Sequence, residues 1–194
     1  HAAGPALLEF FQSQQRTIDS ETFSQAMIEF HQDFRDSMAN FARDAKQVYE
    51  FKRISDMGLA SWEYGINTIV SVLGALAEHP YKSLLKIALK LTRMSRGKPK
   101  TIPSTLGQVI GACKVLWAEG HGPIILVEER AVTIRNSSAH GSVKFDTENK
   151  TVSFIDKGAV DLGPWQQREL FDYYADFTGR WKAMTTAFSM IRWT

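Results

Sequence analysis

The chain has 194 residues and a mass of 21.9 kDa, which suits one compact domain or at most two. Hydrophobic residues make up 44 % and charged residues 23 %, values that exclude a disordered chain and a collagen-like repeat. The single cysteine, Cys113, excludes an internal disulfide and a metal cluster of thiolates, so we expect a reducing, cytoplasmic compartment. The longest apolar stretch, 69–77, is too short to span a bilayer, and we expect no membrane partner.

The first helix is predicted from a run of apolar residues that recurs at the helical period from Phe23 to Val48. Ser20 is its expected N-cap, and the helix is expected to reach the mid-fifties. Such a length suits ordinary core packing or a dimer surface. A second helix is expected over 60–78 and should stop before Pro80, because a proline pushes the preceding residue out of helical geometry.

The middle of the chain predicts three more helices. A cationic helix begins near Lys82, and a loop with glycine and prolines ends it before 104. Ser104 and Thr105 open the next helix. Another helix is expected to start at Pro123 and to end at Gly141, a residue suited to the left-handed cap position.

After residue 141 the spacing of apolar residues changes from the helical period to strict alternation. Residues 142–146 and 151–155 alternate apolar and polar side chains around the polar segment 147–150, which predicts a small β-hairpin. A long helix is expected after Gly163-Pro164 and to the end of the chain. The predicted fold is an all-α bundle with one inserted hairpin, in a single domain over 1–194, of which 1–80 could be a family-specific extension.

Positive charge is concentrated in one segment. Residues 81–100 hold seven basic and no acidic residues, although the whole chain has a formal net charge of only +2. We call this set the cationic stripe: Lys82, Lys86, Lys90, Arg93, Arg96, Lys98 and Lys100. The first four recur at helical spacing, so the stripe is interpreted either as a solvated helix face or as a surface that binds RNA phosphates.

Motifs for several chemistries are missing from the sequence. No His-x-His or His-x-x-x-His pair offers metal ligands on one helix face, and neither a glycine-rich phosphate loop nor a Gly-x-Ser-x-Gly turn occurs. We therefore predict no metal and no cofactor.

The segment 134–141 is the strongest candidate for a catalytic site. Arg135 carries a fixed cation whose planar shape matches a phosphate, and His140 can accept a proton from a hydroxyl group. Asn136 lies four residues before His140, so on a helix it can orient the imidazole. Arg135 and His140 are five residues apart, or about 140° around a helix. They would converge on one phosphate only if the helix loosens near Gly141 or if a second subunit completes the site.

This segment resembles the signature of the HEPN ribonucleases (higher eukaryote and prokaryote nucleotide-binding domain). In that family an Arg is followed by four to six residues, the first of them polar and often Asn, and then by His, which matches Arg135, Asn136 and His140. The Ala-His-Gly ending and the hairpin that follows are similar to bacterial members. The resemblance is sharp over about 123–158 and only architectural elsewhere.

The resemblance implies a helical homodimer that cuts RNA without a metal at a cleft between two motifs. His140 would be the general base for a ribose 2′-hydroxyl, Arg135 would stabilise charge on the phosphate, and Asn136 would position His140. The product would carry a 2′,3′-cyclic phosphate. Many family members are toxins of toxin–antitoxin or antiphage systems, which implies a protein antitoxin as a possible partner.

Three other interpretations stay open at the level of sequence. Arg135 could cap its helix or pair with Glu128 or Glu129, while His140 is only a C-terminal histidine that the helix dipole favours. The chain could be a non-catalytic HEPN-like module that binds RNA, a nucleotide or a protein through the cationic stripe. It could also be a purely structural helical dimer.

Overall fold

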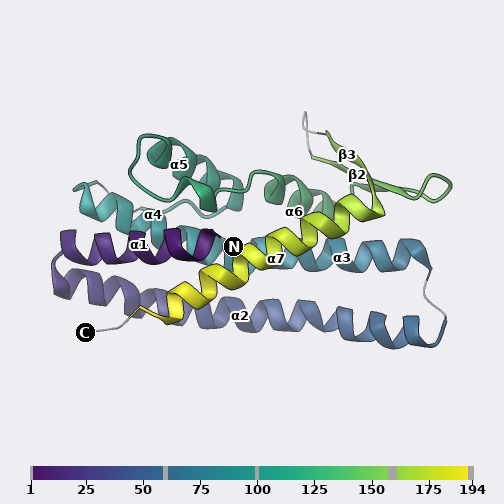
Figure 1. Cartoon of the computed structure of the whole chain (residues 1–194), viewed down its shortest axis with the longest axis horizontal. Helices are drawn as coiled ribbons and strands as arrows, with labels where there is room; N and C mark the ends of the chain where they lie inside the picture. Colours follow the sequence, from purple (N-terminus) through teal and green to yellow (C-terminus); the bar gives the residue numbers. More distant parts are fainter. Residues whose placement is uncertain (1, 59–60, 99–100, 157–160, 192–194) are drawn as a thin grey trace. The chain divides into compact units, whose positions relative to one another are not determined.

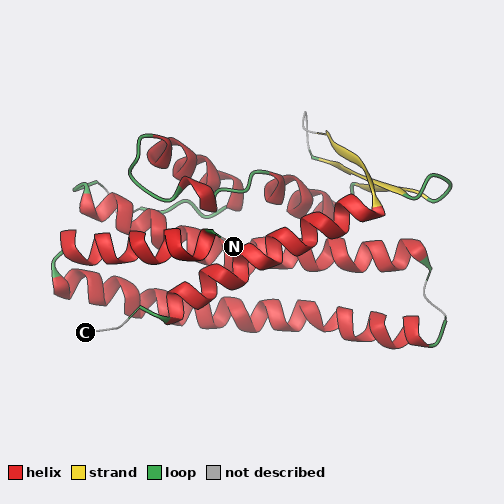
Figure 2. Ribbon diagram, viewed as in Figure 1, coloured by secondary structure: helices red, strands yellow, loops and turns green. Residues whose placement is uncertain are grey.

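The computed structural model describes residues 2–58, 61–98, 101–156 and 161–191 (Figure 1). These residues are mostly helical and include one small antiparallel sheet, so the predicted fold class is confirmed (Figure 2). The helices are α1 (Ala3–Thr17), α2 (Ser20–Asp56), α3 (Trp62–Leu76), α4 (Lys82–Ser95), α5 (Leu106–Ala118), α6 (Arg130–His140) and α7 (Gln167–Ser189). A π-helical turn, η1 (Ala77–Tyr81), joins α3 to α4, and a short 3-10 turn, η2 (Ile124–Leu126), precedes α6.

The contacts between residues divide the chain into two compact units. The first holds 2–37, 80–98, 101–128 and 177–191, and the second holds 38–58, 61–79, 129–156 and 161–176 of the described residues. Both α2 and α7 contribute residues to each unit. The single domain expected over 1–194 stays a prediction.

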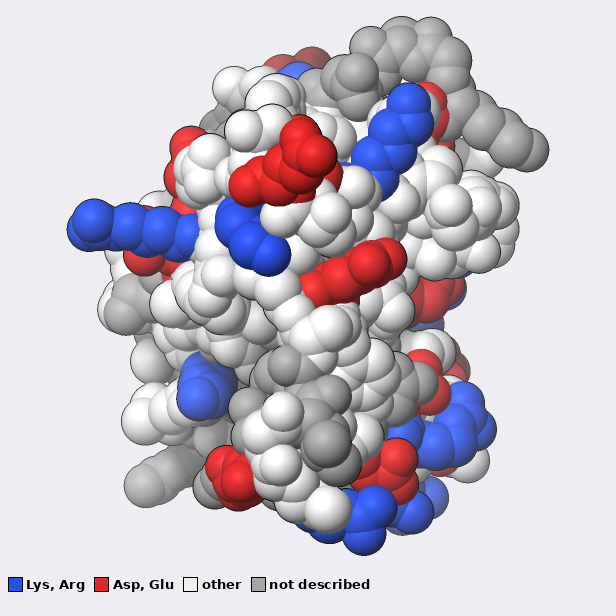
Figure 3. Space-filling model, turned by 90° about the vertical axis from the view of Figure 1, so that its right-hand side faces the viewer, with Lys and Arg blue, Asp and Glu red and all other residues white. Residues whose placement is uncertain are grey.

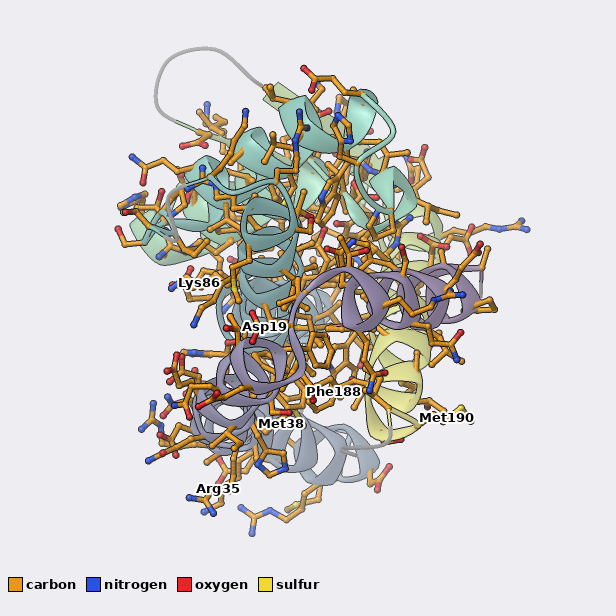
Figure 4. The ribbon with its side chains drawn as sticks, turned by 90° about the vertical axis from the view of Figure 1, so that its left-hand side faces the viewer. Asp19, Arg35, Met38, Lys86, Phe188 and Met190 are labelled. Atoms are coloured by element: carbon orange, nitrogen blue, oxygen red, sulfur yellow. The ribbon has the colours of Figure 1, made fainter. Side chains whose placement is uncertain are left out.

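An aromatic cluster occupies the core of the first unit. Phe188 of α7 packs edge-on against Phe30 of α2, with ring centroids 4.8 Å apart, and also against Phe34 and Phe11. Figure 4 shows Phe188 between the helices of this unit, whereas Met190 lies at the outer edge. Trp117 of α5 is buried, and its indole N–H donates to the Thr92 hydroxyl at 3.1 Å. Burial raises the pKa of Cys113, also on α5, to about 12.

The second unit packs α3 against α6 and the sheet against α6. The strands are β1 (Val143–Asp146), β2 (Thr151–Ile155) and β3 (Asp161–Gln166), in the order β1-β2-β3. Val152 and Phe154 of β2 are buried, as the alternating pattern of the hairpin predicts. The ring centroids of Phe154 and of Trp165 on β3 are 5.5 Å apart. Trp165 therefore extends the apolar face of β2 onto β3.

Several local predictions are confirmed. The Thr105 side chain caps α5 by accepting from the Gln108 amide, and Gly141 ends α6 in the left-handed conformation with φ of 64°. The predicted hairpin corresponds to β1 and β2. α4 and α7 also form where the apolar periodicity predicts them, although α7 ends at Ser189 and does not include Met190 and Ile191. The helix α1 and the strand β3 were not expected.

The predicted N-cap at Ser20 is wrong by one residue. The Asp19 carboxylate accepts from the Thr22 amide at 2.8 Å, and Ser20 is already the first residue of α2. A charged oxygen satisfies the free amides of a helix start and also suits its positive dipole end.

Pro80 does not end the second predicted helix as expected. The chain passes from α3 through the π-helical turn η1, which contains Pro80, directly into α4. A proline lacks the N–H of a helical hydrogen bond, and a π-turn accommodates such a defect without breaking the helix. Glu78 and His79 therefore lie in a π-helical turn, which is wider than a regular α-helical turn.

The single helix expected over 123–141 is also wrong, because η2 and α6 are separate. The buried Tyr81 hydroxyl donates to the Leu126 carbonyl at 2.6 Å and accepts from the Glu128 amide at 2.9 Å. Arg180 donates to the Ile125 carbonyl at 2.7 Å. These tertiary hydrogen bonds replace the helical ones, so α6 starts only at Arg130.

Candidate functional site

The predicted catalytic residues Arg135, Asn136 and His140 all lie on α6. The helix stays regular through His140, and Gly141 forms its cap only after that residue. The loosening that would bring Arg135 and His140 together in one copy is therefore not observed. At five residues' separation, the two side chains leave α6 in directions about 140° apart.

Arg135 is held by two neighbours. Its Nε lies 2.8 Å from Glu78 Oε2, and its Nη1 donates to Asn136 Oδ1 at 2.9 Å. The alternative in which Arg135 pairs with Glu128 or Glu129 is not observed, because Glu78 of η1 takes that place. The two contacts orient the guanidinium plane, and its Nη2 has no partner among the described residues. With 32 % of its side chain exposed, Arg135 can still reach a ligand.

Asn136 does not hydrogen-bond to His140, contrary to the role expected from their spacing. Its Nδ2 donates to Asp156 Oδ2 at 2.7 Å, and its Oδ1 accepts from Arg135. Asn136 thus links Arg135 to the residue that follows β2. In this geometry it positions the arginine.

His140 is exposed at the last turn of α6. No described residue forms a hydrogen bond or an ion pair with its side chain. The imidazole is consequently available to a substrate or to a second copy of the chain.

A cavity of about 280 Å³ lies beside Arg135 in the second unit. Its lining comes from α2, α3, η1 and α6: Asp44, Ser71, Gly74, Ala75, Glu78, His79, Arg135, Ser138 and Ala139. Gly74 allows the close approach of α3 and α6, because a Cβ there would lie 3.3 Å from both the Cβ and the Oγ of Ser138. The two helices therefore bring Arg135 to the edge of a hollow rather than to a flat surface.

A histidine that the sequence analysis did not select also lines this cavity. His79 Nε2 lies 3.2 Å from Asp44 Oδ2, and their side chains are 25 % and 37 % exposed. Arg43 Nε lies 3.4 Å from the other carboxylate oxygen of Asp44. His79 belongs to no metal-ligand pair and lies outside the segment 134–141, so those motifs give it no predicted role. The signal for His79 is structural: it lies in the π-helical turn η1 together with Glu78 and Pro80, and π-turns often occur at functional sites.

The described residues of the cationic stripe lie on α4 and directly after it, and salt bridges engage some of them. Lys90 pairs with Glu29 at 2.7 Å, Arg96 lies 3.5 Å from Glu119, and Arg93 donates to the Thr101 carbonyl. Lys86 lies at the outside of α4 in Figure 4, and Lys98 is exposed. Lys82 is half-buried at the start of α4, and Lys100 lies outside the described residues. Several of the predicted phosphate ligands are thus engaged within the fold.

Elsewhere charges of both signs mix. On the face shown in Figure 3, Lys and Arg side chains lie among Asp and Glu side chains. Within the described ranges, no group of three or more His, Cys, Asp or Glu side chains could hold a metal ion. No described helix is both long and apolar enough to cross a membrane.

Comparisons with models of known protein families, with curated protein sequences and with solved structures found no match to this chain. The site is therefore interpreted from its own geometry and from the motif in its sequence.

Proposed function

We propose that the chain is a metal-independent endoribonuclease of the HEPN type. The observation that carries this proposal is the guanidinium of Arg135, which two neighbours orient at the edge of a cavity while its Nη2 stays available. Hydrogen-bond donors fixed in this way stabilise charge that develops on a phosphate, because they need no reorganisation during the reaction.

The reaction would be an attack of the ribose 2′-oxygen on the neighbouring phosphorus. His140 takes the proton of the 2′-hydroxyl, and Arg135 stabilises the charge on the phosphate oxygens. The bond from phosphorus to the 5′-oxygen then breaks. The products end in a 2′,3′-cyclic phosphate and a 5′-hydroxyl.

The active form would be a homodimer, since Arg135 and His140 diverge on α6 of one copy. In such a dimer Arg135 of one copy and His140 of the other face one phosphodiester. A nuclease of this kind damages the RNA of its own cell, which gives a neutralising protein partner a purpose, as in toxin–antitoxin or antiphage systems.

The first test measures cleavage of an RNA oligonucleotide by the purified chain in the presence of EDTA. Arg135→Ala and His140→Ala should each lower the rate by about 10²- to 10⁴-fold, because each removes a group that acts in the transition state. Arg168→Ala and His121→Ala are matched controls on exposed side chains and should keep the full rate. Undiminished cleavage by both the Arg135 and the His140 variant would overturn the proposal.

A second test asks whether the site is shared between copies. Equal amounts of the Arg135→Ala and His140→Ala chains, unfolded and refolded together, should regain about a quarter of the wild-type rate, because half of the dimers are mixed and each has one intact site. If the mixture stays as inactive as its components, the dimeric site is wrong.

A non-catalytic RNA-binding module is the alternative, and it is favoured by the helical spacing that places Lys82, Lys86, Lys90 and Arg93 on one face of α4. Neutralising Lys82 and Lys86 together should then weaken RNA binding and reduce its dependence on salt by roughly two ion contacts. Under this alternative the wild-type chain would bind RNA without cutting it.

A further inference from the structure

Cleavage of RNA by this route needs one proton removed from the 2′-hydroxyl and one proton supplied to the leaving 5′-oxygen. Only the first transfer has a residue assigned to it so far. His140 removes the proton of the 2′-hydroxyl, but the departing 5′-oxygen also needs a proton to become a good leaving group. The cavity beside Arg135 contains a histidine with no role so far, namely His79.

We propose that His79, oriented by Asp44, is the general acid that protonates the leaving 5′-oxygen in the copy that supplies Arg135. This inference rests on the proposed nuclease function and extends it to a residue outside the family motif. It also assigns a function to the cavity and to the π-helical turn.

The contact with Asp44 decides which nitrogen of His79 can act. Because Nε2 donates its hydrogen to Asp44 Oδ2 at 3.2 Å, Nδ1 is the nitrogen that exchanges a proton with a ligand. No described residue bonds to Nδ1. A carboxylate that fixes the ring in this way is the arrangement by which many enzymes orient a catalytic histidine.

The charged groups around His79 come from three elements. Asp44 of α2 contacts the ring, Glu78 of η1 and Arg135 of α6 line the same cavity, and Arg43 lies against Asp44. Glu78 is paired with Arg135, so this carboxylate is largely neutralised where a phosphate would enter. A phosphodiester held by Nη2 of Arg135 would therefore lie within the cavity that His79 lines.

The 2′-hydroxyl gives its proton to His140 of the second copy, the new bond forms between the 2′-oxygen and phosphorus, and the bond to the 5′-oxygen breaks. The 5′-oxygen takes the proton from Nδ1 of His79. Afterwards His140 releases its proton to water and His79 regains one from water, so no other reactant is consumed.

The decisive experiment compares two substrates in the full-length chain. One is an RNA dinucleotide, and the other is uridine 3′-(4-nitrophenyl phosphate), whose nitrophenolate leaves without a proton. His79→Gln keeps an N–H donor toward Asp44 but cannot transfer a proton. It should lower the rate on the dinucleotide by about 10²- to 10⁴-fold and the rate on the activated ester by less than about threefold.

The pattern of losses separates the possible roles. His140→Ala should be slow on both substrates, because the base is needed for either leaving group. His121→Gln is the matched control, since His121 also lies beside a carboxylate, at 3.5 Å from Glu119, and it should behave as wild type. If His79→Gln slows both substrates equally, or neither, His79 is not the general acid.

The pH profile and chain mixing give two further readouts. Loss of an acid should remove the fall of the dinucleotide rate on the alkaline side of its profile. Refolding His79→Gln with His140→Ala should restore about a quarter of the rate, whereas mixing it with Arg135→Ala should restore none, because His79 and Arg135 serve the same site.

The failures of the two proposals are distinguishable. If the wild type cuts neither substrate, the nuclease function and this inference both fall. If the wild type cuts both, requires Arg135 and His140, and is unaffected by His79→Gln, only the inference falls.

Discussion

Each unit of the molecule contains an arginine–glutamate pair in which both side chains are largely buried, and these two pairs differ in what surrounds them. In the first unit Arg180 and Glu128 are 3.6 Å apart, and their side chains are only 13 % and 8 % exposed. In the second unit Arg135 and Glu78 are 2.8 Å apart, at 32 % and 25 % exposure, beside a cavity.

The neighbours of the first pair are backbone groups. Arg180 also donates to the Ile125 carbonyl, and the amide of Glu128 donates to the buried Tyr81 hydroxyl. Burial raises the pKa of Tyr81 well above the ordinary tyrosine value, so this hydroxyl stays neutral. This cluster fixes the path of the chain before α6 and has a structural role.

The neighbours of the second pair leave donors available to a ligand. Asn136 fixes one edge of the Arg135 guanidinium, Glu78 fixes another, and Nη2 has no partner among the described residues. The same two residue types thus build a structural link where they are buried, and a candidate binding group where a cavity opens beside them.

The largest expected effect separates the two glutamates. Glu128→Ala removes the buried carboxylate of the first pair and should lower the free energy of unfolding by about 3 to 5 kcal/mol. Glu78→Ala leaves Arg135 able to bind water in the cavity and should cost at most about 1 kcal/mol. Urea titrations of both variants against the wild type measure the difference. Equal losses would contradict the distinction between a buried and an accessible pair.

A smaller effect is expected from Tyr81→Phe. The variant removes one hydroxyl and leaves the Leu126 carbonyl and the Glu128 amide without it, which should cost about 1 to 3 kcal/mol of unfolding free energy. A loss near zero would show that the hydroxyl does not hold the 126–128 backbone in place.

The same tyrosine gives a test by pH. Its pKa is raised in the folded state, so unfolding becomes easier once the unfolded tyrosine ionises, above a pH of about 10. The stability that Tyr81 contributes is thus present below that pH and is lost as the pH rises further. Tyr81→Phe should lose less stability than the wild type between neutral and strongly alkaline pH.

The sequence predicted those elements whose signals are local. The cap at Thr105, the left-handed Gly141 and the alternation in β1 and β2 each depend on a few neighbouring residues, and all three are observed. The path around 126–128 was missed because Tyr81, more than forty residues earlier in the chain, supplies its hydrogen bonds.

In the candidate site, too, the local signals were predicted and the contacts between distant residues were not. Arg135 was found from its motif, but its partner Glu78 comes from the turn before α4. His79 and Asp44 are 35 residues apart, and only the packing of α2 beside η1 brings them into contact. Side-chain pairing across such distances cannot be inferred from spacing along one helix, which is also why Asn136 was assigned to His140 rather than to Asp156.

The smallest expected effect concerns an exposed turn of the second unit. The Asp146 carboxylate accepts from the Asn149 amide at 2.9 Å, from the Asn149 side chain at 2.7 Å and from the Glu148 amide at 3.0 Å. These hydrogen bonds, with the Asn149 amide first, hold the pKa of Asp146 below its ordinary value. The carboxylate form is thus favoured by the folded turn.

Because the pKa is lowered on folding, the contribution of Asp146 is complete above the ordinary aspartate pKa and is lost as the pH falls through the folded value. The amide NMR signals of Glu148 and Asn149 should shift together with a midpoint below the ordinary range of aspartate, and Asp146→Ala should abolish that shift. A midpoint for Asp146 within or above the ordinary aspartate range would mean that the turn does not favour the charged carboxylate.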